Sequence, residues 1–169
     1  TAQSGVEPFD GSFEAVADAY VDEAKKTANY GQQPYLRVKN TAKDINSYLK
    51  FEVEGLASCA STDYSELQLF ATNGGPDGGE LYPTSNDWTE TGINWNNAPA
   101  LDYYIDWVGS VNANSFVYFY ADIEGNGVYS FGLHNNSKTQ VQYESREGAH
   151  TPQLNVYWLQ KPQWMPDAQ

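Results

Sequence analysis

The sequence contains a single cysteine, Cys59, among 169 residues. One cysteine excludes an internal disulfide framework and a zinc site built on cysteines. Long apolar runs are also missing, since none approaches the ~20 residues that a helix needs to cross a bilayer. We therefore expect a soluble chain that does not enter a membrane. Its length suits one domain with a proper core.

Basic residues are scarce, because nine Lys and Arg stand against 22 Asp and Glu, for a formal net charge of −13. Proteins that bind nucleic acid need a basic surface, so this balance argues against a nucleic-acid partner. The acidic residues are either an ordinary solvated surface or a source of carboxylates for a hard cation such as calcium.

Aromatic residues are abundant: they make up 15 % of the chain, with thirteen Tyr and five Trp. This composition is typical of a β-rich protein. Alternation of apolar and polar residues, bounded by turn signals, predicts about nine short strands and no helix of ten residues or more. The expected strands are 12–22, 35–39, 48–54, 65–72, 80–84, 115–123, 127–135, 139–147 and 152–160. We predict an all-β fold, an antiparallel two-sheet β-sandwich of jelly-roll type.

The same pattern predicts the domain organisation. Residues 12–160 form the sandwich, residues 1–11 are an N-terminal linker, and residues 161–169, with two prolines, are a C-terminal linker. Because no signal segment precedes Thr1, we expect a mature or excised part of a longer protein.

Basic side chains gather on two predicted strands. In PYLRVKN, Leu36 and Val38 alternate with Tyr35, Arg37 and Lys39. If this strand pairs with SYLKFEVEG and with TQVQYESRE, several cations share one face, and like charges on one face lower stability. A bound polyanion explains such a face, because Arg donates two hydrogen bonds to a carboxylate. Neutralisation by neighbouring Glu, at under ~1 kcal/mol a pair, explains it equally well. The predicted ligand-binding residues are Tyr35, Arg37, Lys39, Tyr48, Lys50 and Arg146.

One acidic residue stands inside a strand pattern. Asp18 is flanked by alanines, and Asn29 closes the loop that follows. A buried carboxylate needs a partner. That partner is either calcium, which takes oxygens gathered from several loops, or an arginine such as Arg146. The predicted metal residues are Asp18 and Asn29, for a structural calcium ion.

Catalytic signals are absent. His134 and His150 are the only histidines, and no serine stands in a G-x-S-x-G setting. Among 22 acids a close pair of carboxylates is expected by chance, so such a pair does not indicate a glycosidase. We therefore expect no enzyme activity.

Four segments resemble a known family. ADAYVD…NYGQQPYLRVKN, YLKFEVEGL, DWTETGINWNNAPAL and ESREGAHTPQLNVYW resemble, in this order, the DNRLRE or disaggregatase-related domain, also classified as carbohydrate-binding module family 96. The resemblance runs from about Ala17 to Trp158. It implies a non-catalytic β-sandwich module of secreted or cell-surface proteins, several of them polysaccharide lyases, with alginate as the usual ligand. The chain departs from the family pattern in 101–135, which is longer and more aromatic, and at Lys50, where relatives often carry Arg.

Trp88 and Trp95 of the family motif have two interpretations. Their rings are either platforms for sugar stacking or buried anchors of an ordered loop, and we favour the second.

The sequence thus predicts a carbohydrate-binding module that docks an acidic polysaccharide, first of all alginate, on a sheet face. It would hold a covalently linked secreted enzyme near its substrate. A structural or adhesive module of a cell-surface protein, without a glycan ligand, is the alternative. A lyase or glycosidase is a third hypothesis.

Overall fold

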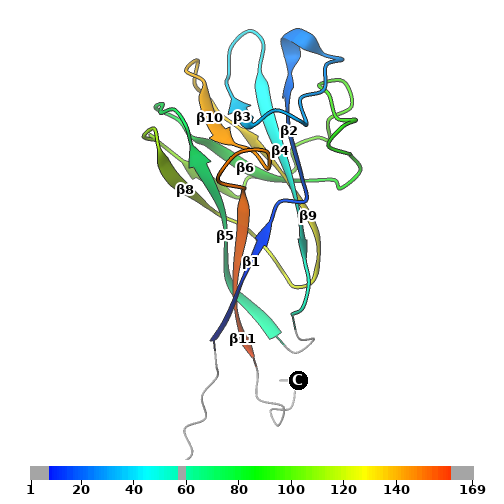
Figure 1. Cartoon of the computed structure of the whole chain (residues 1–169), viewed down its shortest axis with the longest axis vertical. Helices are drawn as coiled ribbons and strands as arrows, with labels where there is room; N and C mark the ends of the chain where they lie inside the picture. Colours follow the sequence, from blue (N-terminus) through cyan, green and yellow to red (C-terminus); the bar gives the residue numbers. More distant parts are fainter. Residues whose placement is uncertain (1–7, 57–59, 161–169) are drawn as a thin grey trace, which may run out of the picture.

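Two antiparallel β-sheets make up the structure, a computed structural model that describes residues 8–56 and 60–160 (Figure 1). The larger sheet has the order β1-β11-β5-β10-β3, with β8 also paired to β5. Its strands are β1 (Pro8–Glu14), β11 (Gln153–Gln160), β5 (Ala60–Ala71), β10 (Val141–Glu144), β3 (Tyr35–Val38) and β8 (Ser115–Tyr120).

The smaller sheet has the order β2-β4-β9-β6-β7. Its strands are β2 (Ala17–Asp22), β4 (Ile45–Val53), β9 (Gly127–His134), β6 (Gly79–Thr84) and β7 (Asp106–Val108). A 3-10 turn, η1 (Glu23–Lys25), follows β2. None of the helical segments in the described ranges is long and apolar enough to cross a membrane.

The inner faces of the two sheets share one hydrophobic core. Because side chains alternate along a strand, every second residue points inward. The fully buried members come from both sheets and include Leu36, Leu49, Phe51, Leu67, Phe119, Phe131, Tyr143 and Leu154. The predicted all-β two-sheet sandwich is confirmed, whereas the jelly-roll connectivity stays a prediction.

The predicted strand 12–22 is two strands in different sheets. The amide of Ala15 still donates to Pro152 O next to β11, but the amide of Val16 donates to Lys50 O of β4. The chain therefore crosses between the sheets at this point. It also begins to pair earlier than expected, because Pro8 at the start of β1 lies opposite Leu159. Residues 8–11, assigned above to a linker, are thus part of a strand, and 161–169 lie outside the described residues.

A long loop, residues 85–105, covers the outer face of β2 and β4. It lies beside these strands at the upper right of Figure 1. Trp88 and Ile93 of the loop form a second, smaller cluster with Ala19, Val21 and Tyr48. The smaller sheet is therefore buried on both sides in this region.

We predict that Phe131→Ala lowers the free energy of unfolding by about 3–5 kcal/mol, because it leaves a cavity between the sheets. Phe131 is 1 % exposed, and its ring centroid lies 6.2 Å from that of Phe51. Val128→Ala on the same strand is the control, since Val128 is 44 % exposed. Urea denaturation measures both variants. Equal losses of unfolding free energy in the two variants would contradict the inward orientation of Phe131 and the outward orientation of Val128.

Candidate functional site

The cationic face expected from the sequence is not formed. Beyond one bridge between Lys39 and Ile45, β3 and β4 do not pair. β3 lies at the edge of the larger sheet next to β10, and β4 lies in the smaller sheet between β2 and β9. The residues predicted to point inward on each strand are buried. The turn at 40–44, however, leads the chain from one sheet to the other.

Tyr48 and Lys50 lie beneath the loop 85–105. Tyr48 is 3 % exposed, and its hydroxyl donates to Pro99 O at 3.0 Å. The ammonium group of Lys50 donates to Trp88 O at 2.6 Å and to Asn86 O at 3.0 Å, and it lies 4.6 Å from the centre of the Trp88 ring. Burial lowers the pKa of Lys50. Both side chains therefore fasten the loop to β4.

The structural interpretation of Trp88 is confirmed. Its ring is 6 % exposed, and its Nε1 donates to Ser130 Oγ at 3.2 Å. Trp95 packs half-buried against the same cluster. The Trp88 ring is therefore not an open platform.

Three of the six predicted residues remain together, Tyr35 and Arg37 on β3 and Lys39 directly after it. The Arg37 guanidinium lies 4.3 Å from the centre of the Tyr35 ring and 5.3 Å from that of Tyr20. Tyr20 in turn stacks on Tyr30 at 4.3 Å, so these groups close the gap between the edge strands β2 and β3. Lys39, half-buried, follows at the end of β3. Arg146 is elsewhere, in an ion pair with Glu90 at 2.8 Å.

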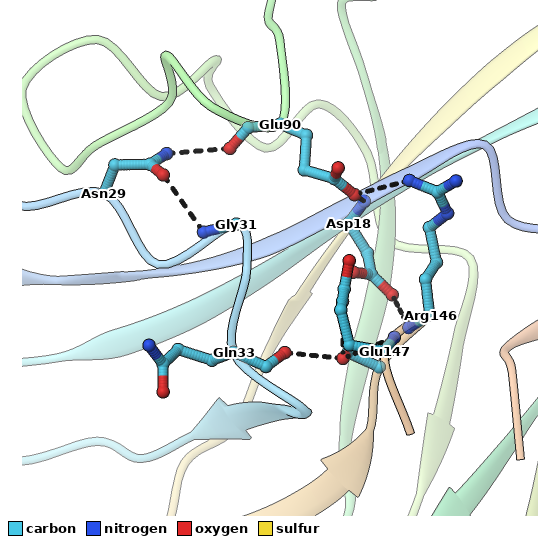
Figure 2. Close-up of polar contacts among 8 residues, drawn as sticks. Asp18, Asn29, Gly31, Gln33, Glu90, Arg146 and Glu147 are labelled. Atoms are coloured by element: carbon cyan, nitrogen blue, oxygen red, sulfur yellow. Dashed lines mark hydrogen bonds and ion pairs between the residues drawn. The ribbon is translucent and has the colours of Figure 1, made fainter. Parts of the chain in front are cut away.

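The predicted metal residues separate. Asp18 lies on the inner face of β2, 1 % exposed, close to the carboxylates of Glu90 and Glu147. Asn29 instead contacts backbone: its Nδ2 donates to Glu90 O at 2.7 Å (Figure 2). The same Nδ2 donates to Ile93 O, also at 2.7 Å. Asn29 therefore positions the loop that carries Glu90, and its own oxygen accepts from Gly31 N. Glu90 and Glu147 were not predicted as metal ligands, because each stands in polar sequence where an acid is ordinary.

Both histidines form hydrogen bonds with polar neighbours. His134 Nδ1 lies 2.9 Å from Asn46 Oδ1, and His150 Nδ1 lies 2.8 Å from Glu144 Oε2.

A row of exposed aromatic rings lies on the outer face of the larger sheet. The strand β8 reads SFVYFY, in which Val117 and Phe119 are buried and the alternate residues point outward. Tyr64 of β5 lies between two of its neighbours, with ring centres 5.7 Å from Tyr120 and 6.1 Å from Tyr157. The exposed members, 38–49 % accessible, are Tyr64, Phe116, Tyr118, Tyr120 and Tyr157. We call these five residues the tyrosine face.

Side-chain amides lie beside these rings. Gln68 of β5 is opposite Tyr118 on one side and Gln153 on the other, and Glu66 is opposite Tyr120 and Asn155. Asn155 Nδ2 donates to Gln68 Oε1 at 3.2 Å and Glu66 Oε1 at 3.3 Å. A hollow of about 260 Å³ opens here, lined by Gly11, Ser12, Asn155 and Tyr157. Rings and hydrogen-bonding groups thus alternate across three neighbouring strands.

The sequence carried a signal for this face that the prediction did not use. In SFVYFY every residue after Ser115 is apolar or aromatic, so both faces of the strand carry such side chains. A strand whose outward residues are Phe116, Tyr118 and Tyr120 exposes more ring surface than solubility alone favours. The prediction used the basic residues of PYLRVKN and SYLKFEVEG instead.

We predict that Lys50→Met lowers the free energy of unfolding by about 1–3 kcal/mol, because two carbonyl oxygens lose a charged donor. Chemical denaturation measures the change. Lys43→Met is the control, since Lys43 is exposed and lies 3.8 Å from Glu23; its loss is expected to stay below ~1 kcal/mol. A wild-type value for Lys50→Met would show that the loop does not depend on this anchor.

A family of known proteins matches the chain over most of the described sandwich. A search of curated proteins finds no match. The model of carbohydrate-binding module family 96 matches residues 10–157 of the 169-residue chain, from β1 into β11. This range includes the tyrosine face and the loop 85–105. The chain therefore belongs to carbohydrate-binding module family 96.

Proposed function

We propose that this carbohydrate-binding module docks an extended, uncharged polysaccharide on the tyrosine face. The observation that carries the proposal is the row of five exposed rings on three adjacent strands. Burying large apolar rings on a ligand removes apolar surface from water, worth about 25 cal/mol per Å². A protein exposes so many rings on one face mainly where something binds.

The chemistry of the face suits a sugar polymer. A tyrosine ring presents a flat apolar face with a polar hydroxyl, so it packs on the C–H surface of a pyranose and still contacts water. The neighbouring groups Gln68, Gln153 and Asn155 donate and accept hydrogen bonds, as sugar hydroxyls do. Asn155 Nδ2 donates to Gln68 Oε1, and the Ser12 hydroxyl lies within hydrogen-bond distance of Gln153 Oε1 and Asn155 Oδ1. These cross-strand bonds hold the amides in place before a ligand arrives.

Charge favours an uncharged ligand. The described residues paired with the strands of the tyrosine face at this point include Glu66 and no Lys or Arg. Asp63, Asp122 and Glu124 line a hollow together with Tyr64 and Tyr120. The whole chain carries a formal charge of −13. Such a field repels a polyanion at low salt.

An acidic polysaccharide such as alginate is the second candidate ligand. Five of the nine basic residues lie between residues 25 and 43, and Arg37 and Lys39 follow Tyr35 along β3. A uronate chain bound there would meet carboxylate-binding donors next to aromatic rings. β10 lies between β3 and β5, so this region is at the β3 edge of the larger sheet and separate from the tyrosine face.

We infer that the module is part of a longer protein and catalyses no reaction itself. It would hold a linked catalytic or surface domain of a secreted protein near its polysaccharide and raise the effective concentration. Membership of a carbohydrate-binding family supports this role. Incubation with the bound glycan should release neither reducing ends nor unsaturated products.

The proposal is tested by affinity electrophoresis in gels that contain laminarin, xylan, galactomannan or alginate. We expect at least one uncharged glycan to retard the protein. Tyr118→Ala should weaken that retardation about tenfold or more, because one stacking surface of ~1–2 kcal/mol is lost. Its melting temperature should stay near that of the wild type, since Tyr118 is 49 % exposed.

Tyr104→Ala is the matched control, because Tyr104 is 57 % exposed outside the tyrosine face. Retardation by alginate alone, lost in Arg37→Gln but not in Tyr118→Ala, would overturn the proposal in favour of the second candidate. If no glycan retards the protein, the tyrosine face is a protein contact and the adhesive alternative is favoured.

A further inference from the structure

Three carboxylates from distant parts of the chain meet at one end of the sandwich. Asp18 comes from the inner face of β2, Glu90 from the loop 85–105, and Glu147 from the turn after β10. One oxygen of each lies within 4.8 Å of one oxygen of the other two. In Figure 2 the carboxylates of Asp18 and Glu147 lie close together, and Glu90 reaches toward them from the loop.

Hydrogen bonds occupy only one oxygen of each carboxylate. Asp18 Oδ2 accepts from Arg146 N at 2.8 Å, and Glu147 Oε2 accepts from Ser145 Oγ at 2.9 Å. Glu90 Oε1 accepts from Asp18 N at 3.0 Å and from Arg146 Nη1 at 2.8 Å.

The remaining oxygen of Asp18 has no hydrogen-bond donor. Asp18 Oδ1 is completely buried and unpartnered within the part of the chain that the structure describes. Leaving a buried carboxylate oxygen unpaired is costly, and native proteins rarely do so. An unpaired, buried oxygen on a carboxylate that lies beside two others indicates that a positively charged partner is missing.

The charges of the cluster do not balance. Three carboxylates against the one guanidinium of Arg146 leave a formal charge of −2. The guanidinium bonds to Glu90, so Arg146, the arginine considered from the sequence, reaches Asp18 only through its backbone amide. Burial, together with the charges of Glu147 and Glu90, raises the pKa of Asp18 to about 7. The buried, unpaired oxygen and the excess of negative charge together favour a bound cation.

We propose that Asp18, Glu90 and Glu147 bind a structural calcium ion. The donors are all oxygens, which excludes the softer metals that prefer histidine and cysteine. Calcium–oxygen bonds measure about 2.3–2.6 Å, so ligands on opposite sides of the ion lie up to ~5 Å apart. The three oxygens lie within 4.8 Å of one another, a separation that one calcium ion can span. Magnesium, with bonds near ~2.1 Å, needs a tighter set.

The ion would connect three segments that the backbone alone does not join. Its ligands lie on β2, on the covering loop and after β10, and Asp18 and Arg146 are 128 residues apart. An ion that binds only the folded chain stabilises it by mass action. Its expected role is to fix the loop 85–105 against the edge of the sandwich.

The test uses the whole chain without sugar. Thermal unfolding is followed in millimolar CaCl₂ and, separately, in EDTA, and calorimetry with CaCl₂ gives the stoichiometry. We expect one ion per chain and a melting temperature about 5 °C or more higher with calcium. Glu147→Gln, an exposed change that leaves the fold intact, should remove most of this difference, and so should Asp18→Asn.

Glu52→Gln is the matched control, because Glu52 is exposed on β4 outside the cluster, and it should keep the full calcium effect. Identical melting in CaCl₂ and EDTA would overturn the site. So would a calcium effect that survives in both Glu147→Gln and Asp18→Asn, and an equal effect of MgCl₂ would overturn the choice of metal. None of these outcomes bears on sugar binding, which is measured separately.

Discussion

The period-two alternation of the strands places half of their side chains between the two sheets and leaves the other half outside. The two outer faces then differ in what covers them. The loop 85–105 lies over β2 and β4 of the smaller sheet, where Trp88, Ile93 and Tyr48 form a second cluster. The face formed by β5, β8 and β11 of the larger sheet keeps its rings in contact with solvent. The aromatic residues under the loop therefore stabilise the fold, whereas those on β5, β8 and β11 can contact a ligand.

The covering loop also explains where several charged residues are used. Lys50 binds two of its carbonyl oxygens, and Arg146 holds its Glu90. Asn29 binds its backbone from the other side. Gly31 lies so close to Glu90 O that a Cβ there would be 2.0 Å away. In a chain so poor in Lys and Arg, two of them hold one loop and are not available as ligand contacts.

The strands could be predicted from the sequence because alternation is a local property. The two-sheet fold followed from their number and spacing. Which strands become neighbours is not local, so the separation of β3 and β4 and the crossing at Ala15 and Val16 were missed. Asp18 could be singled out because an acid in an apolar pattern is unusual. Its companions Glu90 and Glu147 could not, since only the folded chain brings them within reach.

The pairing of β1 with β11 has a mechanical consequence. Pro8, where β1 begins, lies opposite Leu159, near the end of β11, and within the described residues β1 has no second neighbour. Hydrogen bonds of an antiparallel pair run perpendicular to the strands. A tensile force that pulls these two strand ends apart therefore loads the bonds one after another, like a zipper, instead of shearing all of them together. Under tension, β1 would peel away first and at low force, while the remainder of the sandwich stays folded.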